Sequence, residues 1–426
     1  MTKPGVSITT FGCRVNQYES AMMAQLLGSQ RTKATAQTDV HVLNACTVTR
    51  LAERKARQAA RRLRRDYPGS RIVVIGCLAD AVEQGLTQFD DADLLAGNAW
   101  KSHIVDVIRR AHLGERGLLP PIEPCPLGEE RSRGTQGRAR AYLKVQDGCS
   151  RACTYCRPTQ LRGLPRSKPI DSAVSEACGL IRDGFPEIVL TGIDLAQYAP
   201  SDATLADAVR RILAIKGLAR LRIASLNPAG LVSPLITAFA SDDRACPHFH
   251  IPLQSGDDQV LHRMARGYTV SKYLEAIDTV RREIPHATFG TDVIVGFPGE
   301  SDSAFANTCQ VVQDVGFINL HVFRFSARPG TAATGLPNPI PEDVKRRRAE
   351  QLDQQWRRTR RRQLDNRIGS THHVLVEERR GEQWRGYTSD YLYVHFASDQ
   401  EIPVGSIRSV RIIAVVEDHL EGTIDD

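Results

Sequence analysis

Three cysteines stand close together near the middle of this 426-residue chain, at Cys149, Cys153 and Cys156. Their C-x3-C-x2-C spacing predicts three thiolate ligands for one iron–sulfur cluster. A [4Fe-4S] cluster held by cysteine normally takes four thiolates, so three in one short loop leave one iron open to another molecule. A structural zinc site is the alternative. Zinc sites usually combine two such knuckles, however, and no second pair follows this loop.

This loop resembles the signature of the radical S-adenosylmethionine enzymes. An aromatic residue directly before the last cysteine, here Tyr155, strengthens the resemblance. The resemblance implies that S-adenosylmethionine binds the open iron.

A second set of three cysteines lies in the first hundred residues, at Cys13, Cys46 and Cys77. Each follows the end of a predicted strand by one or two residues, within an alternating strand–helix pattern typical of an open α/β domain. The ends of parallel strands lie along one edge of a sheet, so we expect the three thiols to converge. Buried structural cysteines are the alternative.

The composition favours an intracellular metalloenzyme. Ten cysteines in 426 residues are too few for a disulfide framework, so we expect reduced thiols. No window approaches the roughly 18 apolar residues of a membrane span, and we expect a cytoplasmic protein that does not bind membranes. The net charge of +7 is mild, and it indicates an anionic partner only where basic residues cluster.

Strand, helix and breaker patterns divide the chain into five segments of an α/β protein. The prediction is an open α/β domain at 1–115, a linker at 116–137, a partial (β/α)6 barrel at 138–340, a basic helix at 341–367 and a small antiparallel β-barrel at 368–426. Chemistry in a parallel barrel takes place at the C-terminal strand ends. The cysteine loop at 149–156 follows the first predicted barrel strand.

Small and polar residues follow four other predicted barrel strands at the same rim. They are Thr191, Gly192 and Asp194 after the second strand, Ser225 after the third, Gln254, Ser255 and Gly256 after the fourth, and the segment 296–300 after the fifth. Any one of these segments, taken alone, is an ordinary turn. Together with the cysteine loop they predict a rim that binds the nucleoside and methionine parts of the cofactor.

Basic residues cluster on two predicted helices, one carrying Arg61 and Arg65 and the other Arg358 and Arg361. A solvated helix face is the alternative. The second cluster has few acidic residues and directly precedes the small β-domain, so we favour contact with RNA phosphates. The β-domain adds basic and aromatic candidates, including Arg379, Arg385, Tyr387 and Tyr391. Core packing is the alternative for its aromatic residues.

Over nearly its whole length the chain resembles the radical S-adenosylmethionine methylthiotransferases. These combine an N-terminal methylthiotransferase domain, a radical barrel and a C-terminal TRAM domain. The opening motif, Thr10-Phe11-Gly12-Cys13-Arg14-Val15-Asn16, resembles the branch that acts on threonylcarbamoyladenosine in tRNA. The sister branches typically have Gly-Cys-Gln-Met-Asn (isopentenyladenosine) or Leu-Gly-Cys-x-Lys-Asn (ribosomal protein) there. Three further motifs look like the first branch: Cys46-Thr47-Val48-Thr49, 292–300 and 324–331.

The resemblance implies two [4Fe-4S] clusters, one on each set of three cysteines. One S-adenosylmethionine would be cleaved to a 5'-deoxyadenosyl radical, and another would supply a methyl group. The radical would take hydrogen from C2 of the adenine at position 37. No side-chain base could deprotonate this carbon, so the bond requires a radical. That carbon would then receive methylthio from the N-terminal cluster, so we assign no general acid or base. The implied partners are the tRNA anticodon stem-loop, an electron donor and a sulfur source.

Two other functions stay open at this stage. A related enzyme would modify isopentenyladenosine in tRNA or an aspartate of a ribosomal protein, and a cluster-bearing RNA-binding regulator would catalyse nothing. The opening motif disfavours the ribosomal-protein substrate, and the complete second cysteine set disfavours the regulator.

The chain departs from the family directly after the cysteine loop. Members usually have Cys-Ile-Ile-Pro-x-x-Arg-Gly, whereas this chain has Cys156-Arg157-Pro158-Thr159-Gln160-Leu161-Arg162-Gly163. Arg162 and Gly163 keep their places, but the proline comes one position earlier and an arginine replaces an apolar residue. We therefore expect different loop packing near the cluster, with the three thiols unaffected.

Overall fold

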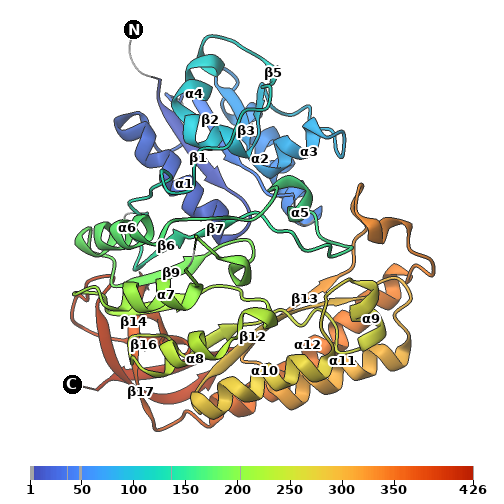
Figure 1. Cartoon of the computed structure of the whole chain (residues 1–426). Coiled ribbons are helices and arrows are strands. Elements are labelled where there is room, and N and C mark those ends of the chain that lie inside the picture. Colours follow the sequence, from blue (N-terminus) through green and yellow to red (C-terminus); the bar gives the residue numbers. More distant parts are fainter. Residues whose placement is uncertain (1–3, 36, 48–49, 136, 202, 426) are drawn as a thin grey trace.

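A computed structural model describes residues 4–35, 37–47, 50–135, 137–201 and 203–425. The chain forms an N-terminal domain, a central barrel and a small C-terminal barrel, drawn from blue to red in Figure 1. Two residues of the motif after Cys46, Val48 and Thr49, lie outside the described residues. Every helix in the described part is too short or too polar to cross a bilayer.

The N-terminal domain is built on one parallel sheet with strand order β1-β2-β3-β4-β5. Its strands are β1 (Val6–Thr10), β2 (Val40–Asn44), β3 (Arg71–Ile75), β4 (Leu94–Ala96) and β5 (Gly117–Leu118). Its helices are α1 (Arg14–Leu27), α2 (Arg50–Asp66), α3 (Cys77–Glu83) and α4 (Ile104–His112). One core packs α1 and α4 on one face of the sheet, and a second packs α2 and α3 on the other. The predicted open α/β domain is confirmed.

Six parallel strands form the central barrel, in two sheets with orders β10-β9-β6 and β11-β12-β13. Isolated bridges join the two sheets at Leu221–Ala245 and Ser225–His250. The strands are β6 (Arg140–Lys144), β9 (Glu187–Thr191), β10 (Arg220–Ile223), β11 (His248–His250), β12 (Thr288–Val295) and β13 (Asn319–Arg324). The predicted partial six-stranded barrel is confirmed.

Helices surround the barrel strands. They are α6 (Ile170–Arg182), α7 (Leu205–Leu213), α8 (Ser233–Ala240), α9 (Asp258–Arg263), α10 (Val270–Glu283) and α11 (Asp302–Val315). Two short elements, β7 (Gln146–Asp147) and α5 (Pro158–Leu161), flank the cysteine loop, and β7 pairs with β8 (Arg166–Ser167).

The strands turn an apolar face to the helices and a polar face to the barrel interior. Ala141, Leu143, Leu190 and Phe249 belong to the core that includes the helices. Because side chains alternate along a strand, the intervening residues of the same strands point inward. Those residues include Tyr142, Glu187, Arg222, His248, His250, Asp292 and His321. The interior is therefore lined largely by polar and charged groups.

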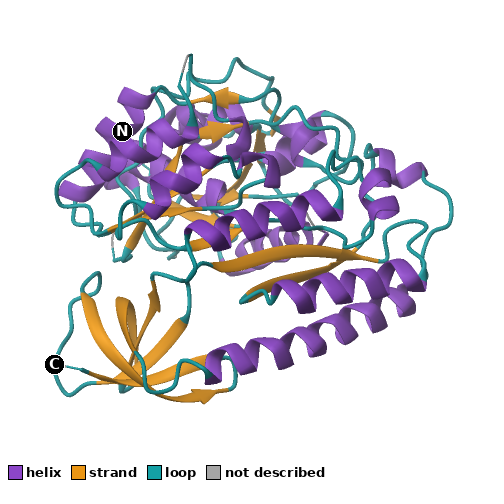
Figure 2. Ribbon diagram, turned by 60° about the horizontal axis from the view of Figure 1, so that its bottom comes forward, coloured by secondary structure: helices purple, strands orange, loops and turns teal. Residues whose placement is uncertain are grey.

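Helix α12 (Glu342–Asp365) runs beside β13 and α11 and leads to the C-terminal barrel (Figure 2). The strands of that barrel are β14 (Thr371–Arg380), β15 (Gln383–Thr388), β16 (Tyr393–Ala397), β17 (Ile407–Val416) and β18 (His419–Ile424). They close in the order β14-β15-β16-β18-β17, and the β16–β18 pair is parallel. The expected all-antiparallel arrangement is thus corrected at one pair, because directions cannot alternate all the way round a ring of five strands.

The loop between β15 and β16 closes the N-terminal end of the central barrel. Arg222 Nη1 donates to the Ser389 carbonyl at 3.0 Å, and Thr288 Oγ1 donates to the Asp390 carbonyl at 2.6 Å. Tyr391 follows and stacks on the His248 ring, with ring centroids 4.8 Å apart. Tyr391 therefore packs against the barrel floor, as its alternative interpretation held.

Candidate cluster and cofactor site

The loop cysteines Cys149, Cys153 and Cys156 lie together at the C-terminal end of the first barrel strand. Burial raises the pKa of Cys156 to about 12, and the nearby thiolates of Cys153 and Cys149 add to that shift. Three thiolates facing one another need a positive centre to stabilise them, and a coordinated metal deprotonates a thiol outright. The donor set thus suits an iron–sulfur cluster with an open iron.

Nitrogen donors surround the sulfur atoms of this loop. Gln197 Nε2 lies 3.1 Å from Cys149 Sγ, and Arg266 Nη1 lies 3.3 Å from Cys153 Sγ. The same Arg266 nitrogen lies 3.3 Å from the Tyr155 hydroxyl. Such N–H···S contacts stabilise ligating sulfur and orient it. Tyr155 therefore supports the loop through Arg266.

The second set of cysteines also converges, at the edge of the N-terminal sheet. Gly12 (φ +113°) lies against Cys46, and a Cβ built on Gly12 would stand 2.4 Å from Cys46 Cβ. Cys13 and Cys77 share Arg162 as a neighbour, and Arg162 Nε lies 3.3 Å from Cys77 Sγ. Asn98 Nδ2 lies 3.3 Å from the same sulfur. Only glycine at position 12 allows Cys13 and Cys46 to approach in this way.

The predicted rim residues separate into two groups. Asp194 faces the cysteine loop and accepts from Arg151 Nε at 2.5 Å, while Thr191 is buried at the end of β9 and Gly192 follows it. Ser225 is exposed at the rim beyond β10.

Gln254, Ser255 and Gly256 form the second group, after β11. The Gln254 Oε1 atom is buried with no protein partner among the described residues, so it can receive a ligand donor. Gly256 N donates to Thr308 Oγ1 at 2.9 Å, and Ser255 Oγ lies 3.4 Å from that oxygen. Ser255 and Gly256 therefore contact α11, and a direct contact of these two with a cofactor stays a prediction.

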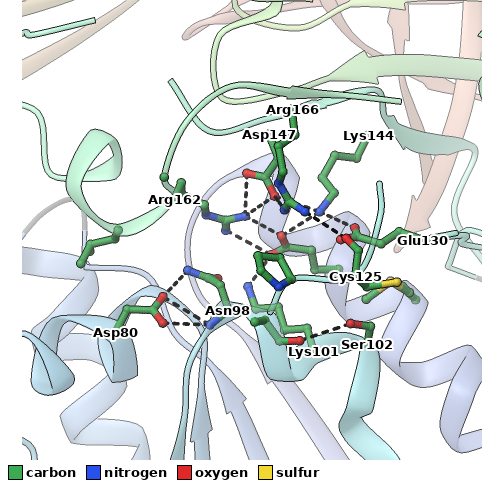
Figure 3. Close-up of a pocket in the computed structure, with 16 residues that line it drawn as sticks. Asp80, Asn98, Lys101, Ser102, Cys125, Glu130, Lys144, Asp147, Arg162 and Arg166 are labelled. Carbon is green, nitrogen blue, oxygen red and sulfur yellow. Dashed lines mark hydrogen bonds and ion pairs between the residues drawn. The ribbon is translucent and has the colours of Figure 1, made fainter. Parts of the chain in front are cut away.

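A buried group of charges joins the N-terminal domain to the barrel beside the cysteines. Figure 3 shows Arg162, Asp147 and Lys144 turned toward one another at a cavity of about 210 Å³. Glu19 of α1 accepts from Arg162 Nη1 at 2.5 Å and from Lys144 Nζ at 3.1 Å, and it also pairs with Lys101. These contacts hold α1, which begins directly after Cys13, against β6 and the cysteine loop.

The unusual residues after the cysteine loop make contacts between domains. Arg157 is 1% exposed, and it donates to the Leu86 carbonyl of the N-terminal domain at 3.3 Å and to the Pro329 carbonyl. Pro158 occupies the first position of α5, where a proline is well tolerated. The departure from the family pattern thus places a buried arginine across a domain boundary.

A second arginine fixes the loop that carries Cys46. Arg328 Nη2 donates to the Thr47 carbonyl at 2.9 Å and to Glu53 Oε2 at 2.6 Å. Burial raises the pKa of Glu53, but hydrogen bonds from Arg328, Thr87 and Arg57 outweigh it and bring that pKa to about 2. The carboxylate therefore stays charged, and this contact ties the Cys46 loop to the barrel.

The six arginines predicted to bind RNA lie on four elements in three parts of the chain. Helix α2, with Arg61 and Arg65, and helix α12, with Arg358 and Arg361, lie on opposite sides of the central barrel in Figure 1. Arg379 and Arg385 lie on β14 and β15. Four of the six form ion pairs with carboxylates: Arg61–Asp91, Arg65–Asp66, Arg361–Asp365 and Arg379–Glu401. RNA contact stays a prediction for all six.

Several polar residues at the site carried no sequence signal. Gln197, Arg266 and Asn98 contact the cysteine sulfurs from elements far along the chain, and they occur outside any recognisable spacing. Another polar group lies inside the barrel, where Asp292 is 3.1 Å from His250 Nε2 and 2.9 Å from His321 Nδ1. These side chains did have a sequence signal. Because side chains alternate between the two faces of a strand, counting every second residue along β11–β13 would have identified them as pointing inward.

Comparison with known proteins agrees with this site. Residues 143–312 match the radical SAM superfamily, and residues 5–97 match a family described as uncharacterized protein family UPF0004. With a TM-score of 0.60 and 13% identity, the fold is similar to a radical S-adenosylmethionine methyltransferase, TsrM, from Kitasatospora setae, over 78% of this chain and 75% of that one. Fold and cysteine loop define a radical S-adenosylmethionine enzyme.

Relatives that match nearly the whole chain show which family of radical S-adenosylmethionine enzymes it belongs to. The chain is 35% identical, over 98% of its length and 97% of the relative, to threonylcarbamoyladenosine tRNA methylthiotransferase MtaB of Chlamydia pneumoniae. It is 34% identical to the protein of the same name from Thermotoga maritima, over 97% of this chain and 95% of that one. It is 31% identical to the tRNA-2-methylthio-N(6)-dimethylallyladenosine synthase of Desulfotalea psychrophila, over 98% of both chains. The chain belongs to the radical S-adenosylmethionine methylthiotransferases of the MtaB type.

Proposed function

We propose that this protein adds a methylthio group to C2 of threonylcarbamoyladenosine at position 37 of tRNA. The observation that carries the proposal is the pair of three-cysteine sites on adjoining domains, joined by Arg162. Arg162 contacts Cys77 of one site and follows Cys156 of the other by six positions. The relatives named for this reaction match nearly the whole chain, which supports this substrate.

Each cysteine site has its own task in this proposal. When bound, S-adenosylmethionine and the [4Fe-4S] cluster at Cys149, Cys153 and Cys156 supply a radical that removes hydrogen from an unactivated carbon. Cys13, Cys46 and Cys77 would hold a second [4Fe-4S] cluster, which would supply the sulfur of the methylthio group. An electron donor and a sulfur source complete the reaction.

The residues of this chain orient the two cysteine sites and fix their positions relative to each other. Gln197 and Arg266 orient the loop sulfurs by hydrogen bonds, and Asn98 does so for Cys77. Glu19 and Arg162 lock the domains together, so that a base bound between the sites meets both in one orientation. No side chain needs to act as an acid or base at C2.

RNA binding in this proposal involves the exposed arginines and the C-terminal barrel as a TRAM domain. The substrate places the enzyme in the cytoplasm with its tRNA. Each phosphate neutralised on duplex-like RNA steepens the salt dependence of binding by about 0.9 if the B-DNA slope applies.

Mass spectrometry of nucleosides from bulk tRNA tests the function. Cells lacking the protein should lose 2-methylthio-threonylcarbamoyladenosine and accumulate its precursor, and a plasmid carrying the wild-type gene should restore it. The Cys149→Ala gene serves as the matched control and should not. Persistence of that nucleoside, with loss of the methylthio form of isopentenyladenosine, would assign the protein to its sister activity instead.

A further inference from the structure

We propose that Arg14 is a specificity-determining residue, whose guanidinium pairs with the carboxylate of the threonyl group on the substrate base. The inference rests on the proposed function, because the threonylcarbamoyl group is what carries a carboxylate to this position. It goes further by naming the residue that recognises that group.

Arg14 lies between the second cysteine site and the barrel interior. It directly follows Cys13 and is the first residue of α1. Its Nη2 atom lies 3.2 Å from the Tyr391 hydroxyl at the barrel floor. Its charge also acts on Tyr142 and His248, two inward-facing residues of the barrel wall. The guanidinium is therefore directed into the barrel from the cysteine site.

The charge of Arg14 has no carboxylate partner among the described residues, unlike the other arginines at this floor. Arg222 Nε lies 3.0 Å from Glu187, and Arg140 Nη2 lies 2.5 Å from Glu377. Arg220 lies 3.9 Å from Glu187. Two carboxylates therefore neutralise three arginines only in part, and Arg14 adds a further positive charge.

Other ionisable groups of the interior leave this excess of positive charge in place. Burial, with Arg222, His250 and Arg14 nearby, holds the pKa of His248 well below its usual range, so that ring is neutral. The carboxylate of Asp292 is occupied by His250 and His321 on the far strands. A half-buried, unpaired guanidinium is complementary to an anion, and Arg binds a carboxylate through two parallel hydrogen bonds.

A cavity lies beside this region and shares Arg140 and Tyr142 with it. It has a volume of about 280 Å³ and lies between α1 and β6, with Gly12, Gln17 and Tyr142 in its wall. The charged residues in its lining are Arg31, Arg138 and Arg140, and the described lining holds no carboxylate. The charged groups of this neighbouring cavity therefore add to the positive charge around Arg14 and do not neutralise it. A dimethylallyl group would leave Arg14 without a counter-charge in a partly desolvated position.

The test compares three anticodon stem-loops of one sequence in a fluorescence anisotropy titration. One carries threonylcarbamoyladenosine at position 37, one carries its neutral methyl ester, and one carries plain adenosine. Wild-type protein should bind the acid about 10-fold or more tighter than the ester, as expected for a charge-assisted hydrogen-bonded pair. Arg14→Gln should abolish that ratio, and Arg14→Lys should keep part of it.

Arg138→Gln is the matched control, because Arg138 is an exposed arginine of the neighbouring cavity. It should weaken binding of all three RNAs by the same factor. Iron content and circular dichroism should be unchanged in Arg14→Gln, which separates recognition from folding. An Arg14→Gln protein that still prefers the acid over the ester overturns the inference.

The outcomes also separate this inference from the proposed function. A wild-type protein that methylthiolates threonylcarbamoyladenosine but binds acid and ester equally overturns the role of Arg14 alone. A wild-type protein that modifies dimethylallyladenosine in place of threonylcarbamoyladenosine overturns both.

Discussion

The buried carboxylate of Glu19 should determine how firmly the N-terminal domain is held to the barrel. Glu19 is 2% exposed and pairs with Lys101, Lys144 and Arg162. Glu19→Gln keeps the shape but removes one negative charge from a balanced buried group. Breaking a buried pair on one side costs about 3–5 kcal/mol, because the remaining charge is left uncompensated.

Hydrogen-exchange mass spectrometry of peptides from α1 measures this loss as local opening. A cost of about 3–5 kcal/mol corresponds to faster exchange by roughly two to more than three orders of magnitude. The matched control is Asp106→Asn on α4, whose ion pairs with Arg109 and Arg110 lie at the surface and contribute less than about 1 kcal/mol. The control should change the exchange rate by less than tenfold. If Glu19→Gln also changes the exchange rate of α1 by less than tenfold, the buried charge group does not hold the two domains together.

The same charge group gives a pH dependence of defined sign. Burial raises the pKa of Glu19, but Arg162, Lys101 and Lys144 outweigh it and hold that pKa well below its usual value. A lowered pKa means that the stabilisation is fully present above the unfolded value of about 4.3 and is lost as pH falls toward the folded value. Wild-type α1 should therefore lose protection on acidification through this range, and the α1 of Glu19→Gln should depend less on pH.

Two further predictions concern the cysteine sites. Cys149→Ala should abolish 5'-deoxyadenosine formation under dithionite, whereas Cys46→Ala should retain it and stop methylthiolation; equal loss of 5'-deoxyadenosine in both variants would refute the division of labour. Arg328→Met should release the Cys46 loop, because Arg328 donates to Thr47 and Glu53. Bound iron should then fall from about eight toward about four atoms per chain with 5'-deoxyadenosine formation retained, and unchanged iron would show that the loop needs no such support.

Much of the fold followed from strand periodicity and the breaker residues. Strand β12 begins at Thr288, although the inward-facing Thr288 and Gly290 interrupt the apolar pattern of its first residues. The convergence of Cys13, Cys46 and Cys77 was predictable, since strand ends in a parallel sheet share an edge.

The supporting contacts of the site were not predictable from the sequence. Gln197, Arg266 and Asn98 reach the sulfurs only through tertiary packing, which leaves no spacing along the chain. The same limit applied to the basic residues. Arg379 is paired with Glu401, an acidic residue far along the chain that a local count of charges does not detect.

The position of Tyr391 at the barrel floor has a consequence for how the enzyme is made. All six cysteines of the two sites are synthesised by Cys156, but the loop that closes the barrel leaves the ribosome much later. At about 5–20 residues per second, the stretch from Cys156 to Tyr391 takes roughly 10–50 seconds to translate. For most of that interval the barrel itself is incomplete, because its last strand ends at Arg324. Until Tyr391 is made, the barrel has no floor and Arg14 lacks its hydroxyl partner. Cluster insertion that yields a closed active centre therefore belongs after translation, on a completed chain.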